Sequence, residues 1–238
     1  MKQNLKLTEL SIIVPIYKEE KNIRKLWIGI KRNLNLKKFE VIYVDDNSKD
    51  NTKKILENIN RKDKRLKFLI RKSKIRDLSK SCILGFNQSR YKNILVMDGD
   101  FQHDPKYIPK MIDKYNTTSS DIIVGCRNFF SKKNIGLDLF RTFVSIFLIN
   151  IINILLGKKT SDPMSGFFLF KKNLFLKSKH RFYKKGYKIL ADIIYSNKDK
   201  IKVSDIIINF NKRKYGKSKI NLKVLVYLIG FILKKVFS

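Results

Sequence analysis

The sequence predicts an α/β fold: a mostly parallel, twisted sheet flanked by helices. Short apolar runs alternate with longer segments whose apolar residues recur every three or four positions. This alternation is typical of β-α-β units, whose right-handed crossovers build a parallel sheet. Several of the runs also end in Pro or Asp, at the strand ends where open α/β sheets bind their ligands.

The expected elements can be placed in chain order. Strands are expected at Leu10–Pro15, Phe39–Val44, Leu66–Ile70, Ile94–Met97, Asp121–Arg127 and Ile201–Asn211. The spacing of apolar residues predicts helices near 23–34, 55–59, 78–89, 105–112 and 185–195, and the stretch 137–156 is strongly apolar. At this length one domain is expected.

The composition indicates an anionic partner. Lys and Arg outnumber Asp and Glu by 53 to 20, a formal net charge of +33. Nucleic acid, a phosphorylated substrate and an anionic lipid surface all fit such a charge. Cys82 and Cys126 lie in apolar contexts and indicate a reducing compartment, and no Cys/His spacing resembles a zinc site. The N-terminus lacks the apolar core of a signal peptide.

The stretch Asp98-Gly99-Asp100 follows an uninterrupted apolar run. If the chain stays extended there, the two carboxylates point the same way and can share one hard cation, and Gly99 lets a ligand approach closely. An Asp-Gly turn closing a hairpin is the alternative, but the flanking segments are predicted helices.

Two other strand ends carry polar residues. Tyr17 and Glu19 follow the first strand, and the paired Asp45 and Asp46 follow the second. The chain lacks a Gly-x-Gly-x-x-Gly turn and a Gly-x-x-x-x-Gly-Lys-Ser/Thr loop, which argues against a dinucleotide-binding Rossmann site and a P-loop NTPase.

Several of these motifs resemble a known family. Ser11–Glu20, Val44–Thr52 and Asp98–Asp100 are similar to the opening, the nucleotide loop and the D-x-D motif of family 2 glycosyltransferases with the GT-A fold. Four further segments resemble the polyprenyl (dolichyl) phosphate mannosyltransferase group within that family: Val96–His103, Gly125–Arg127, Ser161–Phe167 and Arg213–Lys219. The resemblance covers nearly the whole chain.

The resemblance implies a donor site and a metal site. The reaction would transfer a hexose, typically mannose from GDP-mannose, to a polyprenyl phosphate with inversion at the anomeric carbon. The nucleotide-sugar contacts it implies are Pro15, Tyr17, Glu19, Asp45, Asp46 and Asp98. Asp98, Asp100 and Gln102 would bind the cation, and their oxygen atoms suit Mg²⁺ or Mn²⁺.

The acceptor side is implied in the same way. A phosphate monoester is already anionic at neutral pH, so it needs cations to position it rather than a general base. The positions that match the family are Arg127, Arg141 with Ser145, and Arg213, and together with Asp100 they would carry catalysis. Arg141 and Ser145 are four residues apart and share one face of a helix.

The chain departs from the family pattern in two places. Gly99 replaces a usual Ala, a change that should spare the metal ligands, and Asp192 stands where Glu is more usual, so an acceptor-side role for Asp192 is doubtful. The Gln-x-x-Arg-Trp motif of processive polysaccharide synthases is absent, which argues against polymer synthesis.

Residues 1–220 are expected to form the catalytic domain and residues 221–238 a basic, apolar helix suited to a membrane interface. The uncharged part of the 137–156 stretch is too short to span a bilayer, so a buried core helix and a membrane-surface helix both stay open. A cytoplasmic enzyme is therefore expected, associated peripherally with the cytoplasmic face of a membrane through anionic lipid or an anchor protein.

Two other functions remain as alternatives. A UDP-sugar donor, or a glycan or lipopolysaccharide acceptor, would keep the same fold and metal site. A basic nucleic-acid-binding protein would use the charge alone. However, the basic residues are not gathered into one arm and no known nucleic-acid-binding signature is present, so no nucleic acid partner is expected.

Overall fold

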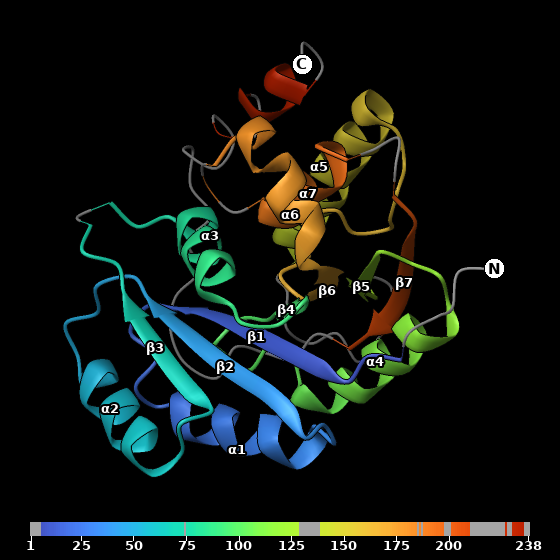
Figure 1. Ribbon diagram of the computed structural model, residues 1–238. Coiled ribbons are helices and arrows are strands. Elements are labelled where there is room, and N and C mark those ends of the chain that lie inside the picture. Colours follow the sequence, from blue (N-terminus) through green and yellow to red (C-terminus); the bar gives the residue numbers. More distant parts are fainter. Residues whose placement is uncertain are drawn as a thin grey trace.

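The computed structural model describes residues 6–73, 75–128, 139–184, 186, 188–197, 201–209, 227 and 230–235, and only the backbone of 139–145. Within these residues the strands form one sheet in the order β3-β2-β1-β4-β6-β5-β7 (Figure 1). The strands are β1 (Glu9–Ile16), β2 (Lys38–Asp45), β3 (Leu66–Ile70), β4 (Asn93–Val96), β5 (Ile122–Arg127), β6 (Phe168–Lys171) and β7 (Val203–Ile208). The helices are α1 (Ile23–Asn33), α2 (Thr52–Lys62), α3 (Leu78–Gln88), α4 (Ile108–Thr117), α5 (Leu139–Leu156), α6 (Lys172–Ser178) and α7 (Ile189–Tyr195).

The sheet is mostly parallel, as the sequence predicts. β6 is the exception, since it pairs antiparallel with both β4 and β5. β6 was not predicted from the sequence. Its four residues run directly into α6, and no turn residue separates the strand from the helix.

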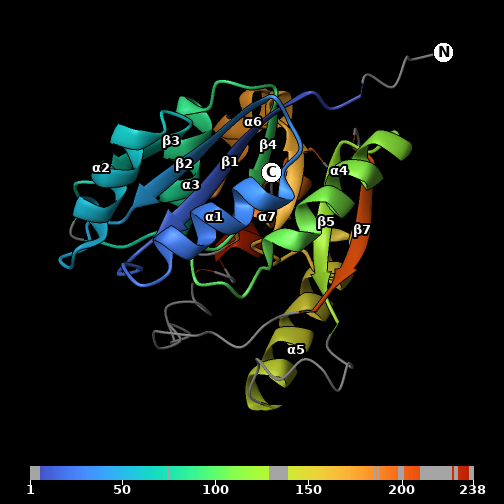
Figure 2. The ribbon, with the colours of Figure 1, turned by 90° about the horizontal axis from the view of Figure 1, so that it is seen from below.

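Helices cover both faces of the sheet. α1, α2 and α4 lie on one face, and α3, α6 and α7 lie on the other (Figures 1 and 2). Each layer buries its own apolar cluster against the strands. On the second face Phe86 of α3 packs edge-on against Phe170 and Phe175, with ring centroids 5.1 and 5.3 Å apart.

α5 is in part a core helix, one of the two alternatives left open for this apolar stretch. Leu148, Ile149, Ile152 and Leu156 are buried. Phe147, Ile154 and Leu155 are 64%, 80% and 53% exposed, and the helix extends away from the sheet (Figure 2). Among the helices that the structure describes, none has both the length and the apolar character needed to cross a bilayer.

Residues 230–235 form a short helix that packs on the protein. Phe231 is fully buried and meets the Tyr183 ring edge-on. Lys235 is also buried, and its Nζ lies 2.9 Å from Oδ1 of buried Asp192. Asp192 in turn accepts hydrogen bonds from the backbone N–H groups of Tyr183 and Lys184. This part of the expected interfacial helix is therefore tied to the catalytic domain, and Asp192 has a structural role.

Pro15 lies just beyond the last residue of β1 that pairs with β4. β1 pairs with β4 only over Ser11–Ile13, and the last bond runs from the Met97 N–H to the Ile13 carbonyl. Backbone groups alternate sides along a strand, so position 15 faces β4 as position 13 does. Pro has no N–H to donate. The hydrogen-bonded pairing of β1 with β4 therefore ends here, at the point where crossovers leave the sheet in opposite directions.

Candidate functional site

The Asp98–Asp100 stretch forms a turn and not the extended segment that the sequence suggested. β4 ends at Val96, and the Gln102 N–H closes the turn onto Oδ1 of Asp100 at 3.0 Å. Phe101 adopts a φ of 64°, which is costly for a residue with a side chain and is found most often at functional sites. Both carboxylates therefore belong to a turn that begins after β4 ends, and strand alternation does not set their directions.

His103 is hydrogen-bonded to the backbone of this turn. Its ring is 2% exposed, stacks on Phe167 at 5.2 Å, and accepts a hydrogen bond at Nδ1 from the Asp98 N–H. Burial, with a smaller contribution from Arg127, lowers the pKa of His103 to about 4, although Asp100 and Asp162 oppose the shift. The imidazole is therefore neutral at pH 7, and its Nδ1 holds no proton for the Asp98 carboxylate 3.4 Å away.

Two glycines allow neighbouring segments to pack closely against the turn. A Cβ on Gly166 would lie 2.9 Å from Oδ2 of Asp98, and one on Gly99 would lie 2.5 Å from Cγ2 of Ile16. Gly166 thus brings the 160–167 loop against the first carboxylate. Gly99 brings the turn against the end of β1, with Cγ of Glu19 also 3.6 Å from the same Cβ position. An Ala at position 99 would not be neutral here, because Ile16 fills its space.

Arg127, at the end of β5, is held by Asp162. Its Nε and Nη2 donate to the two carboxylate oxygens at 2.6 and 2.9 Å, and Asp162 is fully buried. Burial opposes the charge, but Asp162 and, more weakly, Asp98 raise the pKa of Arg127 above its ordinary value. One edge of the guanidinium is thus fixed beside the Asp98 turn.

The 160–167 loop is anchored at both ends. Asp205 on β7 accepts from the Thr160 hydroxyl and from the Ser161 N–H, at 2.5 and 2.8 Å. The Ser165 hydroxyl donates to the Gly125 carbonyl at 2.7 Å. Side chains of three segments that resembled the mannosyltransferase group therefore lie together: the metal turn, the end of β5 and this loop.

The loops after β1 and β2 are joined through Ser48. Asp45 accepts from the Ser48 backbone and hydroxyl, and Ser48 Oγ accepts from the Lys18 N–H at 2.8 Å. Burial raises the pKa of Asp45, and the bonds from Ser48 partly offset this shift. Lys18 and Asn47 both have positive φ. Glu19 accepts from the Asn22 side chain at 2.7 Å and is fixed at the start of α1.

Asp46 is paired with Arg71, which the sequence analysis did not select. Arg71 donates to Oδ1 from Nε at 2.8 Å, its Nη2 lies 2.6 Å from the same atom, and the Asp77 N–H donates to Oδ2 at 2.8 Å. Arg71 follows β3, the strand beside β2. The basic residues that follow β3 were the sequence signal that could have pointed to Arg71.

Tyr17 is covered by a second residue of the β3–α3 segment. The Arg76 guanidinium lies 4.5 Å from the Tyr17 ring centroid, in cation–π range. The β3–α3 segment thus touches two of the residues expected to bind the nucleotide, and it belongs to the candidate site.

The remaining predicted residues are placed only in part. Pro15 lies in β1 just beyond its pairing with β4, and Gln102 is buried in the metal turn. Arg141 and Ser145 belong to the first half of α5, where only the backbone is described, and Arg213 lies outside the described residues. The described residues hold no group of three His, Cys, Asp or Glu side chains arranged for a metal ion. A cation here would therefore use Asp98, Asp100 and an amide oxygen, a hard-oxygen set that fits Mg²⁺ or Mn²⁺.

Comparison with known proteins decides the family. The model of "Glycosyl transferase family 2" matches residues 11–178, most of the chain. The chain belongs to glycosyl transferase family 2. This confirms the resemblance drawn from the motifs, and residues 11–178 include the loops after β1 and β2, the Asp98–Asp100 turn, Arg127 and Asp162.

Several curated relatives carry the name dolichol-phosphate mannosyltransferase. The chain is 32% identical over 219 residues to a dolichol-phosphate mannosyltransferase of Pyrococcus furiosus, covering 91% of this chain and 60% of that protein. It is 29% identical over 233 residues to the dolichol-phosphate mannosyltransferase of Saccharomyces cerevisiae, covering 92% and 83%. The chain thus spans about three fifths of the length of the Pyrococcus relative.

Solved structures support the fold. Glucosyl-3-phosphoglycerate synthase from Mycobacterium tuberculosis, in complex with Mn²⁺, UDP and its glucosyl product, superposes with a TM-score of 0.71 at 14% identity, covering 97% of this chain and 80% of that one. At this identity the likeness concerns the fold alone, and it confirms the expected GT-A architecture.

Proposed function

We propose that this glycosyltransferase transfers a hexose, with mannose from GDP-mannose as the first candidate, to a polyprenyl or dolichyl phosphate with inversion. The family and the names of the curated relatives support the reaction class. The single observation that carries the proposal is the meeting of the Asp98–Asp100 turn with Arg127, which Asp162 anchors. Carboxylates for a cation and a fixed Arg for a phosphate then lie side by side.

The donor would lie across the loops after β1, β2 and β3. Asp46 can accept from a base N–H or a ribose hydroxyl, and Arg71 fixes its orientation. Tyr17 and Glu19 would complete the nucleotide contacts. Asp98, Asp100 and Gln102 would hold Mg²⁺ or Mn²⁺, which offsets the charge that develops on the departing nucleoside diphosphate.

The acceptor needs orientation and no general base, because a phosphate monoester is already an anion at pH 7. Arg127, Arg141, Ser145 and Arg213 are proposed to bind it. His103 is not proposed as a base: it is buried and neutral, and its Nδ1 accepts from the Asp98 backbone.

The exposed face of α5 supports a lipid-bound acceptor. Phe147, Ile154 and Leu155 present apolar surface, and Lys158 and Lys159 follow the helix in exposed positions. Such a face suits a peripheral contact with an anionic membrane. A variant with Ser at the three apolar positions should no longer float with anionic liposomes, whereas wild type floats at low salt. Equal flotation of both proteins contradicts the membrane contact.

Transfer of radiolabelled mannose from GDP-mannose to a polyprenyl phosphate in detergent tests the function. Lipid-extractable label should require Mg²⁺ or Mn²⁺, disappear with EDTA, and be lost in Asp100→Ala. Asp104→Ala is the matched control, because it removes a neighbouring carboxylate that caps the following turn. Label with UDP-glucose alone would change the donor. Metal-dependent nucleotide binding without transfer to the lipid would overturn the acceptor.

A further inference from the structure

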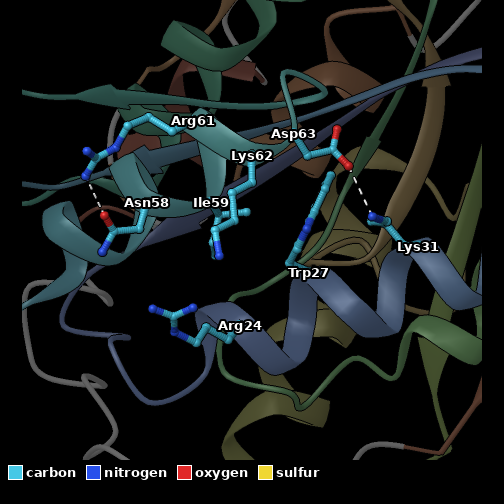
Figure 3. A pocket seen from close by; sticks show the side chains of 8 residues that line it. All are labelled: Arg24, Trp27, Lys31, Asn58, Ile59, Arg61, Lys62 and Asp63. Atoms are coloured by element: carbon cyan, nitrogen blue, oxygen red, sulfur yellow. Dashed lines mark hydrogen bonds and ion pairs between the residues drawn. The ribbon is translucent and has the colours of Figure 1, made fainter.

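A cleft of about 680 Å³ opens between α1 and α2 (Figure 3). Its lining includes four cationic side chains, Arg24, Lys31, Arg61 and Lys62, and one carboxylate, Asp63. None of its residues belongs to the donor, metal or acceptor sets described above. Its volume lies in the range of about 300–1,000 Å³ that is usual for small-ligand sites.

The one carboxylate does not neutralise the cleft. Arg65, outside the cleft, binds Asp63 through Nη2 at 2.7 Å, and Lys31 binds the same oxygen at 3.1 Å. These partners, Arg65 foremost, hold the pKa of Asp63 well below its usual range. The charge of Asp63 is thus already matched, and Arg24, Arg61 and Lys62 form no ion pair within the described part of the chain.

Two of the remaining cations point toward each other from two helices (Figure 3). Arg24 and Lys62 reach toward the same space from α1 and α2, while Arg61 bonds the neutral Asn58 side chain (Figure 3). Arg24 sits in the first turn of α1, which holds no acidic residue and where the helix dipole disfavours a cation. Arg61 and Lys62 are favoured by the last turn of α2. The helix dipole therefore explains two of these charges and leaves Arg24 unexplained.

We propose that this cleft binds a small polyanion carrying two or more phosphate groups, at a second site separate from the nucleotide-sugar site. Guanidinium groups bind phosphate oxygens through paired hydrogen bonds, and an anion between the helices would relieve the repulsion of the converging cations. The cleft is concave and of small-molecule size, which favours a small ligand over a flat protein surface.

Tripolyphosphate is a suitable probe, titrated calorimetrically in EDTA at 150 mM NaCl so that the proposed metal site cannot contribute. The test variant is Arg24→Gln/Arg61→Gln/Lys62→Gln. The matched control is Lys110→Gln/Lys177→Gln/Lys179→Gln, which removes the same charge from exposed positions elsewhere. We expect the test variant to bind at least tenfold more weakly and the control to stay within twofold of wild type.

Metal-dependent binding of the donor nucleotide is measured on the same proteins and should be unchanged in the test variant. Equal weakening in both triple variants would show a diffuse charge effect and overturn the proposal. Unchanged binding in the test variant, or no measurable binding by wild type, would also overturn it. Loss of tripolyphosphate binding alone separates this site from the proposed transferase function.

Discussion

The carboxylate of Asp98 has its position set by a residue nearly seventy positions later. Gly166 lies against it, and His103 holds its backbone from the other side. Any residue with a Cβ atom at position 166 would displace the Asp98 carboxylate. The geometry of the metal turn is therefore controlled from the 160–167 loop as much as from its own sequence.

Replacing Gly166 by Ala should damage activity more than folding. The added methyl group must displace the Asp98 carboxylate, and a misplacement of about 1 Å at a reacting centre costs roughly 100-fold in rate. Metal-dependent nucleotide binding and transfer should both fall, while the melting temperature changes little. Gly29→Ala, on α1, is the control. Full activity in Gly166→Ala would show that Asp98 is not held as described.

Glu40 makes the stability of the sheet sensitive to acid. It accepts from the Ser11 hydroxyl and the Arg90 N–H, both at 2.6 Å, and pairs with Lys67 at 2.7 Å. Burial alone would raise its pKa, but these partners together lower the pKa of Glu40 below its ordinary value. Its stabilisation is therefore complete above the unfolded-state pKa of about 4.3 and is lost as the pH falls through the lowered folded-state pKa.

We expect Glu40→Gln to lose about 1–3 kcal/mol of unfolding free energy at pH 7, because the amide cannot replace a charged acceptor. The difference from wild type should shrink between pH 5 and pH 3. Urea denaturation followed by circular dichroism across this range measures both effects. A difference that stays constant with pH would rule out the charge of Glu40 as its source.

At the scale of elements, the helix at 230–235 is joined to α7 by one buried ion pair. Removing only Lys235 leaves Asp192 charged and buried, and breaking such a pair costs about 3–5 kcal/mol. We expect Lys235→Met to be strongly destabilised, and Lys235→Met/Asp192→Asn to recover part of the loss. Urea midpoints of the two single variants, the double variant and wild type give the coupling. Additive losses would contradict a direct pair.

The elements show why the sequence predicts some features and misses others. The parallel strands were predictable because each buried run is bounded by turn residues. β6 is only four residues long and has no turn residue between it and α6. The turn at Asp98 follows the point where the pairing of β1 with β4 ends, and no pattern near residue 98 reports that. Arg71 was missed because its role depends on β3 lying beside β2, a tertiary fact.

For the molecule as a whole, the two thiols report opening of the core. Cys82 and Cys126 are free and buried, and burial raises the pKa of both above the usual thiol value. A thiol reagent such as dithionitrobenzoate should react with neither in the native protein and with both in urea. The native reaction rate should fall further when a ligand stabilises the fold. Rapid labelling of native protein would show that one layer opens locally.

The sequence predicted the segments that form the candidate site but not the contacts between them. The family motifs identified the metal turn, Arg127 and the 160–167 loop, and the structure places these three together. The partners that hold them, Asp162 for Arg127 and Gly166 for Asp98, lie within one of the quoted motifs, but their contacts come from the meeting of β5 with the loop before β6. Spacing along the chain does not contain this information.

The pairing of Arg127 with Asp162 has a consequence for binding entropy. A free Arg side chain gives up about 2 kcal/mol of rotamer freedom when it is immobilised. Asp162 has already fixed Arg127 during folding, so an anion that meets this guanidinium finds it oriented. The rigidity is supplied by the fold, and less of the binding free energy is spent on ordering the site.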